Sequence, residues 1–313
     1  RIFAELKSVY QRWYGAQVHV ILVDNPSISS MAFDPKNKKV LVAKSFMKRI
    51  IESDQLEDSL AVIKFGLLHE GKHLADSTSN PQLYLDILYK ESFEQPTKVP
   101  TTLRSHAKAV TERFFNSLDS KTKTEFETHK KRLHKFIFDQ FVMLYNCLDD
   151  VWVNRSVGVM ASKFRVDKSI YDLGVNPFYV QVYQFLFQGI VNAEEQNIDI
   201  TKLPKSTQLA YGILLKSMLP DYELIVADKV RSWFYVYFKA FYDTLSPSET
   251  CEDRYFNYAR WIHKIFEELL LENLEEDFKK AQQNQDNGED GEDGEDGEDG
   301  EEKGKGKRKS PND

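Results

Sequence analysis

The sequence predicts an α+β fold that is predominantly helical, with a small sheet near the N-terminus. Three observations lead to this prediction. Short β-branched, apolar runs that end at turn residues occur within the first 43 residues. Beyond about residue 80, apolar residues recur at three- and four-residue spacing, which is typical of amphipathic helices. Residues 125–157 contain no Gly or Pro, so nothing in that stretch interrupts a helix.

The strands come first along the chain. Residues 17–23 are β-branched and apolar, and the Asp-Asn-Pro sequence that follows ends them like a turn. Residues 31–33 and Lys39–Ala43 flank a polar segment and are predicted to form a hairpin. The loop between them contains no Gly, so its turn type stays open.

The helices follow. Ser45 is a candidate N-cap for a helix through Ile51. Asp54 is a candidate cap for the next helix, along which Leu60, Ile63 and Leu67 recur at helical spacing. Further helices are predicted over residues 103–118, 125–157, 178–193, 206–219, 221–245 and 249–278.

The net charge of −7 belongs to the end of the chain. Residues 286–313 hold 12 acidic and 5 basic residues, which leaves 37 of each sign in the rest. A neutral body without a basic stripe does not support a nucleic-acid partner. The Gly-Glu-Asp repeats and the short basic run after them lack apolar residues, so residues 285–313 are predicted to be a disordered tail or linker.

Apolar segments, the N-terminus and the cysteines bear on where the protein is located in the cell. No segment approaches the roughly 20 apolar residues of a membrane span. Residues 1–10 lack the apolar core of a signal peptide, and the absence of an initial Met suggests an excerpt of a longer polypeptide. The two cysteines, Cys147 and Cys251, form no CxxC pair, which suits a reducing cytoplasm.

An HExxH motif at residues 69–73 carries the chemistry. On a helix, His69 and His73 share one face, so both imidazoles can bind one zinc ion at roughly 2.0–2.1 Å. Glu70 follows the first ligand, where its carboxylate can take a proton from metal-bound water and pass it to a leaving amine. A strand, a helix and a buried HExxH helix are the usual order in zincins, in which an edge-like strand, here Lys39–Ala43, pairs with an extended substrate.

A catalytic zinc site needs a third protein ligand. In the apolar stretch 144–154, Asn146, Asp150 and Asn154 form one polar stripe at a spacing of four. A buried carboxylate requires a partner, and a metal ion supplies one to Asp150. Asn154, one turn later, is placed to hydrogen-bond a ligand imidazole or the carboxylate.

Two other acids stay open as the third ligand. Asp149 points about 100° away from the polar stripe, toward apolar and aromatic neighbours. Asp76 follows the second histidine by three residues and is a candidate ligand or a partner of a ligand. Tyr145 and Tyr171 are candidate oxyanion donors. The other histidines are dispersed; those at positions 129 and 134 stand among Lys and Arg and are predicted to lie on a solvated face.

These residues resemble the VWA-associated zinc metallopeptidases, gluzincin-like domains of bacteria and phages. The likeness rests on the HExxH motif and on the Asp-x-x-x-Asn helix of Asp150 and Asn154, 77 residues after His73. It covers roughly residues 15–160, including the hairpin. The resemblance implies that Asp150 replaces the third-ligand Glu of gluzincins, and that Asn154 replaces the Asp that follows it by one turn. It also implies that the acidic tail is a linker toward a von Willebrand A-type domain.

The predicted organisation is a zincin-like core over residues 1–160, a helical subdomain over 161–284 and the tail over 285–313. The predicted function is a zinc-dependent metallopeptidase that acts on a peptide or protein, with no nucleic-acid or membrane partner. The alternative is a non-catalytic zinc-binding module of a larger VWA-type assembly. The retained Glu70 favours the enzyme, because a purely structural site has no use for it.

Overall fold

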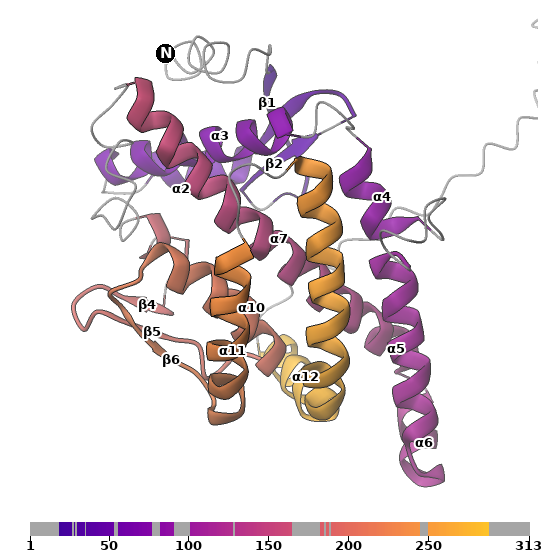
Figure 1. The fold of residues 1–313 in the computed structure, drawn as a ribbon. Helices are drawn as coiled ribbons and strands as arrows, with labels where there is room; N and C mark the ends of the chain where they lie inside the picture. Colours follow the sequence, from indigo (N-terminus) through magenta and orange to yellow (C-terminus); the bar gives the residue numbers. More distant parts are fainter. Residues whose placement is uncertain are drawn as a thin grey trace, which may run out of the picture.

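The computed structural model describes residues 19–26, 28, 30–34, 36–52, 56–76, 82–90, 101–127, 129–164, 182–184, 186–187, 189–244 and 250–287. It confirms a predominantly helical α+β fold with two small three-stranded sheets. In Figure 1 the first sheet lies with α2 and α3 at the top, and the second lies with α10 and α11 at the lower left. The long helix α7 runs diagonally between them.

The first sheet has the order β1-β3-β2, with β1 (His19–Val23) parallel and β2 (Met31–Asp34) antiparallel to β3 (Lys39–Ala43). The predicted hairpin is therefore confirmed. The prediction that Lys39–Ala43 is edge-like is wrong, because β3 is the central strand and buries Val40 and Val42 completely. Within the described residues, β2 is the edge strand next to the HExxH helix.

The hairpin turn forms without glycine through its side chains. Asp34 accepts hydrogen bonds from the backbone N–H of Asn37 at 3.0 Å and from its side-chain amide at 2.8 Å. Lys38 then adopts a left-handed φ of 52°, which returns the chain into β3. An Asx-type turn thus provides what a glycine provides elsewhere.

Two helices cover the sheet. Helix α2 (Lys44–Ile51) follows β3 directly, so its N-cap is Ala43 and the predicted cap at Ser45 is wrong. Helix α3 (Leu56–Asp76) packs on β2 and β3. Gly66 permits this approach, because a Cβ at that position would lie 2.8 Å from the sulfur of Met31. Helix α4 (Leu83–Tyr89) follows.

Helix α7 (Lys130–Phe164) organises the interior. The single helix predicted over 125–157 is divided, because α6 (Ser120–Glu127) ends before α7 begins. Helix α5 (Leu103–Ser117) lies beside α7 as an antiparallel neighbour. Helix α7 also contacts α3, α10 and α12, and it continues beyond residue 160. One hydrophobic core therefore runs through both predicted parts.

The second sheet was not predicted from the sequence. Strands β4 (Val191–Asn192) and β6 (Glu223–Ile225) replace parts of the helices predicted over 178–193 and 221–245, and β5 (Asn197–Asp199) lies outside both. Each is only two or three residues long, too short for a period-two pattern to be visible. Helix α10 (Lys205–Met218) connects β5 to its parallel neighbour β6.

The fold ends with α11 (Asp228–Thr244) and α12 (Cys251–Asn287). Helix α12 extends beyond the predicted end at 278 and packs against α7 and α10. The predicted tail lies outside the described residues from 288 onward. No helix in the described part of the chain has the length and hydropathy needed to cross a membrane.

Candidate metal centre

The HExxH residues lie on α3 where it faces α7. Helical spacing puts His69 and His73 on one face, and the opposite face buries Leu67, Leu68 and Leu74 in the core. The imidazole of His73 stacks on Phe33 of β2, with ring centroids 5.0 Å apart and an interplanar angle of 12°. The sheet and the core thus fix the direction of the histidine pair.

Helix α7 brings Asp150 to this pair. Its Oδ1 lies 3.2 Å from Nε2 of His69 and 3.2 Å from Nε2 of His73, and the two Nε2 atoms lie 3.1 Å apart. Tetrahedral ligands at roughly 2.0–2.1 Å from zinc lie about 3.3–3.4 Å from one another. The three atoms therefore form nearly the triangular face that such an ion requires, and the shorter Asp side chain reaches directly.

One side of the triangle remains accessible. The side chain of His73 is 6% exposed, whereas those of His69 and Asp150 are 13% and 26% exposed. An ion on this triangle would have a fourth position facing the accessible side. Three protein ligands with an open fourth position are typical of catalytic rather than structural zinc sites.

The second nitrogen of His69 is held by Asn154. Nδ1 of His69 lies 2.8 Å from the amide oxygen of Asn154, and the amide nitrogen donates at 2.8 Å to the hydroxyl of Tyr183. Since the amide nitrogen is engaged by Tyr183, its oxygen accepts the proton of Nδ1. This leaves the Nε2 lone pair directed at the metal position.

The second nitrogen of His73 is held by Asp149. Nδ1 lies 2.8 Å from Oδ2 of Asp149, with the geometry of an ion pair rather than of an aligned hydrogen bond. Asp149 is completely buried, so it supports a ligand and does not reach the accessible side of the triangle. Carboxylate–histidine–metal arrangements of this kind orient the imidazole and raise its basicity.

Asp149 lies next to a network of buried charged side chains. Arg254 of α12 is 2% exposed and has Nε 4.0 Å from Asp149 and Nη2 3.0 Å from Asp76. Asp76 also pairs with Lys72 one turn earlier. The guanidinium lies 3.3 Å from the ring centre of Trp152. The structure therefore places Asp76 in this network, away from the ligand triangle.

Glu70 lies between the two ligands on α3 and reaches β2. Because Ala43 donates its backbone N–H to the carbonyl of Ser30, the backbone groups of Phe33 point away from β3, toward the outer edge of β2. There the N–H of Phe33 donates to the Glu70 carboxylate. Burial raises the pKa of Glu70, although the neighbouring histidines and this hydrogen bond act in the opposite direction.

The charges of the centre are mutually dependent. Burial alone would lower the pKa of His69, but the charge of Asp150 raises it above the usual value. Burial also opposes ionisation of His73, yet its contacts with Asp149 and Asp150 raise its pKa well above normal. Burial would raise the pKa of Asp150, but the two histidines lower it. These interactions favour the carboxylate form of Asp150 and the protonated form of the two imidazoles.

The structure supports neither of the two tyrosines that were candidate oxyanion donors. Tyr145 is completely buried against Tyr84, with ring centroids 5.1 Å apart, so it does not face the accessible side of the triangle. Tyr171 lies outside the described residues. Tyr84 donates its hydroxyl to Asn146 of the predicted polar stripe, and burial together with Asp149 and Asp150 raises its pKa well above normal.

Two supporting residues, Tyr183 and Arg254, were not predicted from the sequence. Tyr183 and Arg254 lie 29 and 105 positions from the nearest residues they support, so no local spacing signals their roles. Asp149 was considered from the sequence as an alternative third ligand, and the structure places it instead at Nδ1 of His73. Of the other histidines, His106 and His263 come together with ring centroids 4.1 Å apart.

Comparison of the chain with protein-family models, with curated proteins and with solved structures finds no match in any of the three.

Proposed function

We propose that the chain is a zinc-dependent peptidase whose ligands are His69, His73 and Asp150. The observation that carries this proposal is the triangle of two imidazole nitrogens and one carboxylate oxygen at 3.1–3.2 Å from one another. Nitrogen and oxygen ligands in a partly open tetrahedral arrangement suit zinc. Glu70, next to the first ligand, supports a hydrolytic use.

Zinc in such a site polarises a carbonyl group and lowers the pKa of a water molecule. Glu70 would take the proton from the attacking water and deliver it to the leaving nitrogen of the peptide bond. Burial raises the pKa of Glu70, which makes its carboxylate a stronger base. Asn154 and Asp149 would hold the two imidazoles in place.

Two features support a peptide as substrate. Strand β2, an edge strand within the described residues, lies beside Glu70, and an extended peptide could pair with its outer edge. A cavity of about 430 Å³ adjoins Asp150 and offers apolar walls for a side chain. Those walls include Met143, Phe187 and Leu214.

The test is the Glu70→Gln variant. Zinc-loaded wild-type protein should cleave a denatured protein such as unfolded casein, and the variant should keep one zinc per chain while its rate falls by roughly 10²–10⁴-fold. Glu223→Gln, at an exposed position of β6, serves as the control and should keep the rate. Equal cleavage by Glu70→Gln and wild type would refute the role of Glu70.

The metal site has its own test. His69→Ala and His73→Ala should each abolish stoichiometric zinc in protein purified without chelators. Unchanged zinc content would refute the site. Bound zinc without cleavage by any form would instead support the non-catalytic module of a larger VWA-type assembly, tethered through the acidic tail.

We also infer a reducing location such as the cytoplasm. Both cysteines are free thiols, and Cys147 is buried. Oxidising compartments favour disulfides in exported proteins. Cell fractionation of the tagged full chain tests this inference, and recovery in an exported fraction would overturn it.

A further inference from the structure

Two helices form a positively charged groove at a distance from the metal centre. It lies between α5 and the start of α7 and has a volume of about 760 Å³. We call it the basic groove; its cationic walls are Arg104, Lys108, Lys130, Lys131 and Lys135. Glu112 and Glu127 also line it. No basic stripe is visible in the sequence, because these cations are divided between two segments that only the fold brings together.

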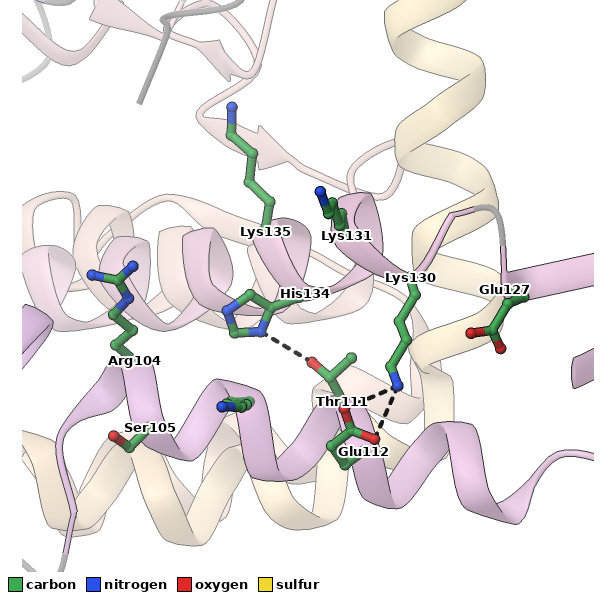
Figure 2. Close-up of a pocket in the computed structure, with 10 residues that line it drawn as sticks. Arg104, Ser105, Thr111, Glu112, Glu127, Lys130, Lys131, His134 and Lys135 are labelled. Atoms are coloured by element: carbon green, nitrogen blue, oxygen red, sulfur yellow. Dashed lines mark hydrogen bonds and ion pairs between the residues drawn. The ribbon is translucent and has the colours of Figure 1, made fainter. Parts of the chain in front are cut away.

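Most of these cations have no ion-pair partner among the residues that the structure describes. Lys130 pairs with Glu112 at 3.0 Å. The other four groove cations are exposed, and none of them forms an ion pair with another residue in the described ranges. Figure 2 shows Arg104 at one end of the groove, His134 in the middle, and Lys130 with the two glutamates toward the other end.

The cations of the groove affect the pKa of a histidine that lies between the two helices. His134 is half-buried between the helices and contacts Thr111 at 3.3 Å. Burial lowers its pKa, and the charges of Arg104 and Lys108 lower it further. The groove is therefore suited to an anionic ligand.

The chemistry of the walls favours an acidic peptide over a nucleic acid. No Phe, Tyr or Trp lines the described groove, so bases would find no stacking platform. The two glutamates leave a moderate excess of three positive charges. An excess of this size offers few contacts to a phosphate backbone, from which most nucleic-acid affinity comes.

The chain itself contains such a peptide. Residues 288–302 hold ten acidic residues in fifteen and are otherwise glycine. They follow α12, whose Phe278 packs on Phe136, the residue after Lys135, with ring centroids 5.8 Å apart. Nine further helical residues to Asn287 add about 14 Å, and fifteen extended residues span up to about 50 Å. The acidic segment can therefore reach the basic groove.

From these observations we propose that the basic groove is the docking site of the chain's own acidic segment, residues 288–302. The tether gives the segment a high effective concentration, so individually weak exposed ion pairs suffice. Lys135 and Asp150 are separated by about 22 Å along α7. Docking therefore leaves the metal centre accessible, and this proposal does not depend on the proposed function.

A zero-length carbodiimide cross-link, which joins a carboxylate to a lysine in contact with it, tests the docking on the full chain. Mass spectrometry should find links from residues 288–302 to Lys108, Lys131 and Lys135. Lys131→Glu with Lys135→Glu should lower the remaining links to Lys108 about tenfold, since two exposed ion pairs become repulsive. The control pair Lys36→Glu and Lys202→Glu makes the same change of charge outside the groove and should leave the links to Lys108 unchanged.

Two further experiments distinguish the acidic segment from a second copy of the chain and from a nucleic acid as the ligand of the groove. In a mixture of isotope-labelled and unlabelled chains, links within one chain support the proposal, and links mainly between labelled and unlabelled chains would assign the groove to a second copy and overturn it. A full chain with its ten tail acids replaced by amides should bind the free peptide of residues 288–302. Tighter binding of a 15-nucleotide single strand, lost in the Lys131 and Lys135 variant, would overturn the proposal in favour of nucleic acid.

Discussion

Each ligand histidine is held at its Nδ1 atom by a side chain of α7. His69 meets Asn154 and His73 meets Asp149 at their Nδ1 atoms, at 2.8 Å in both cases. The Nε2 atoms are thereby left for the metal position. Preorganisation of this kind lowers the entropy lost on metal binding and fixes the tautomer.

Replacing Asn154 by Ala should lower zinc affinity about 10–100-fold, because His69 loses the acceptor that fixes its tautomer and ring direction. Competition with a chromophoric zinc chelator measures the change. Gln140→Ala is the matched control: it removes a buried amide on the same helix that accepts from Ser206 and Thr207. The control should lose stability but keep zinc affinity; equal affinities of the wild type and Asn154→Ala would contradict the role of Asn154.

At the residue scale the sequence was informative where one helix contains both partners. The spacing of His69 and His73 follows from helix geometry alone. Asp150 and Asn154 stood out because polar residues at a spacing of four interrupt an apolar helix. Arg254 could not be found in this way, because its partner Asp149 lies on another helix and charged residues are common in amphipathic sequence.

Among the elements, α10 has an unusual N-terminus. Its N-cap is Pro204, which offers no side-chain acceptor. Asp277 of α12 takes that role from a distance of more than 70 residues, accepting from the backbone N–H of Lys205 at 2.8 Å and of Ser206 at 3.3 Å. A carboxylate at a helix N-terminus satisfies unpaired donors and interacts favourably with the helix dipole.

Asp277→Ala should lower the free energy of unfolding by about 1–2 kcal/mol, the usual cost of losing an N-cap acceptor. Urea denaturation monitored by circular dichroism measures it. Glu276→Ala, one residue earlier, removes a side chain that is 68% exposed and paired with Lys205, so it should cost less than about 1 kcal/mol. If the two variants were equally stable, Asp277 would not be the cap of α10.

Elements with a strong period were predicted well. Helices α5 and α10 begin and end within one residue of their predicted limits. The second sheet was not predicted because its strands have only two or three residues each, and because β6 pairs with β5 across the intervening helix α10. The edge strand was misassigned because strand order depends on tertiary packing: β3 lies between β1 and β2 although it follows both in sequence.

Over the whole molecule, the metal centre joins parts that are far apart in the chain. His73 comes from the sheet-covering helix α3, and Asp150 comes from α7, which also contacts α5, α10 and α12. The network through Arg254 adds α12 to the same centre. An ion bound to this triangle would therefore act as a cross-link between α3 and the helical core, and its effect should extend to global unfolding.

Zinc should therefore raise the midpoint of thermal unfolding of the full chain. Ligand at about 1,000 times its dissociation constant adds roughly 4 kcal/mol, which corresponds to several degrees for a chain of this size. Scanning calorimetry with and without zinc measures the shift, and excess chelator should reverse it. His73→Ala should show no shift, whereas His263→Gln, which alters the separate pair with His106, should keep it. A rise of equal size in His73→Ala would mean that zinc acts elsewhere, because that variant lacks one corner of the triangle.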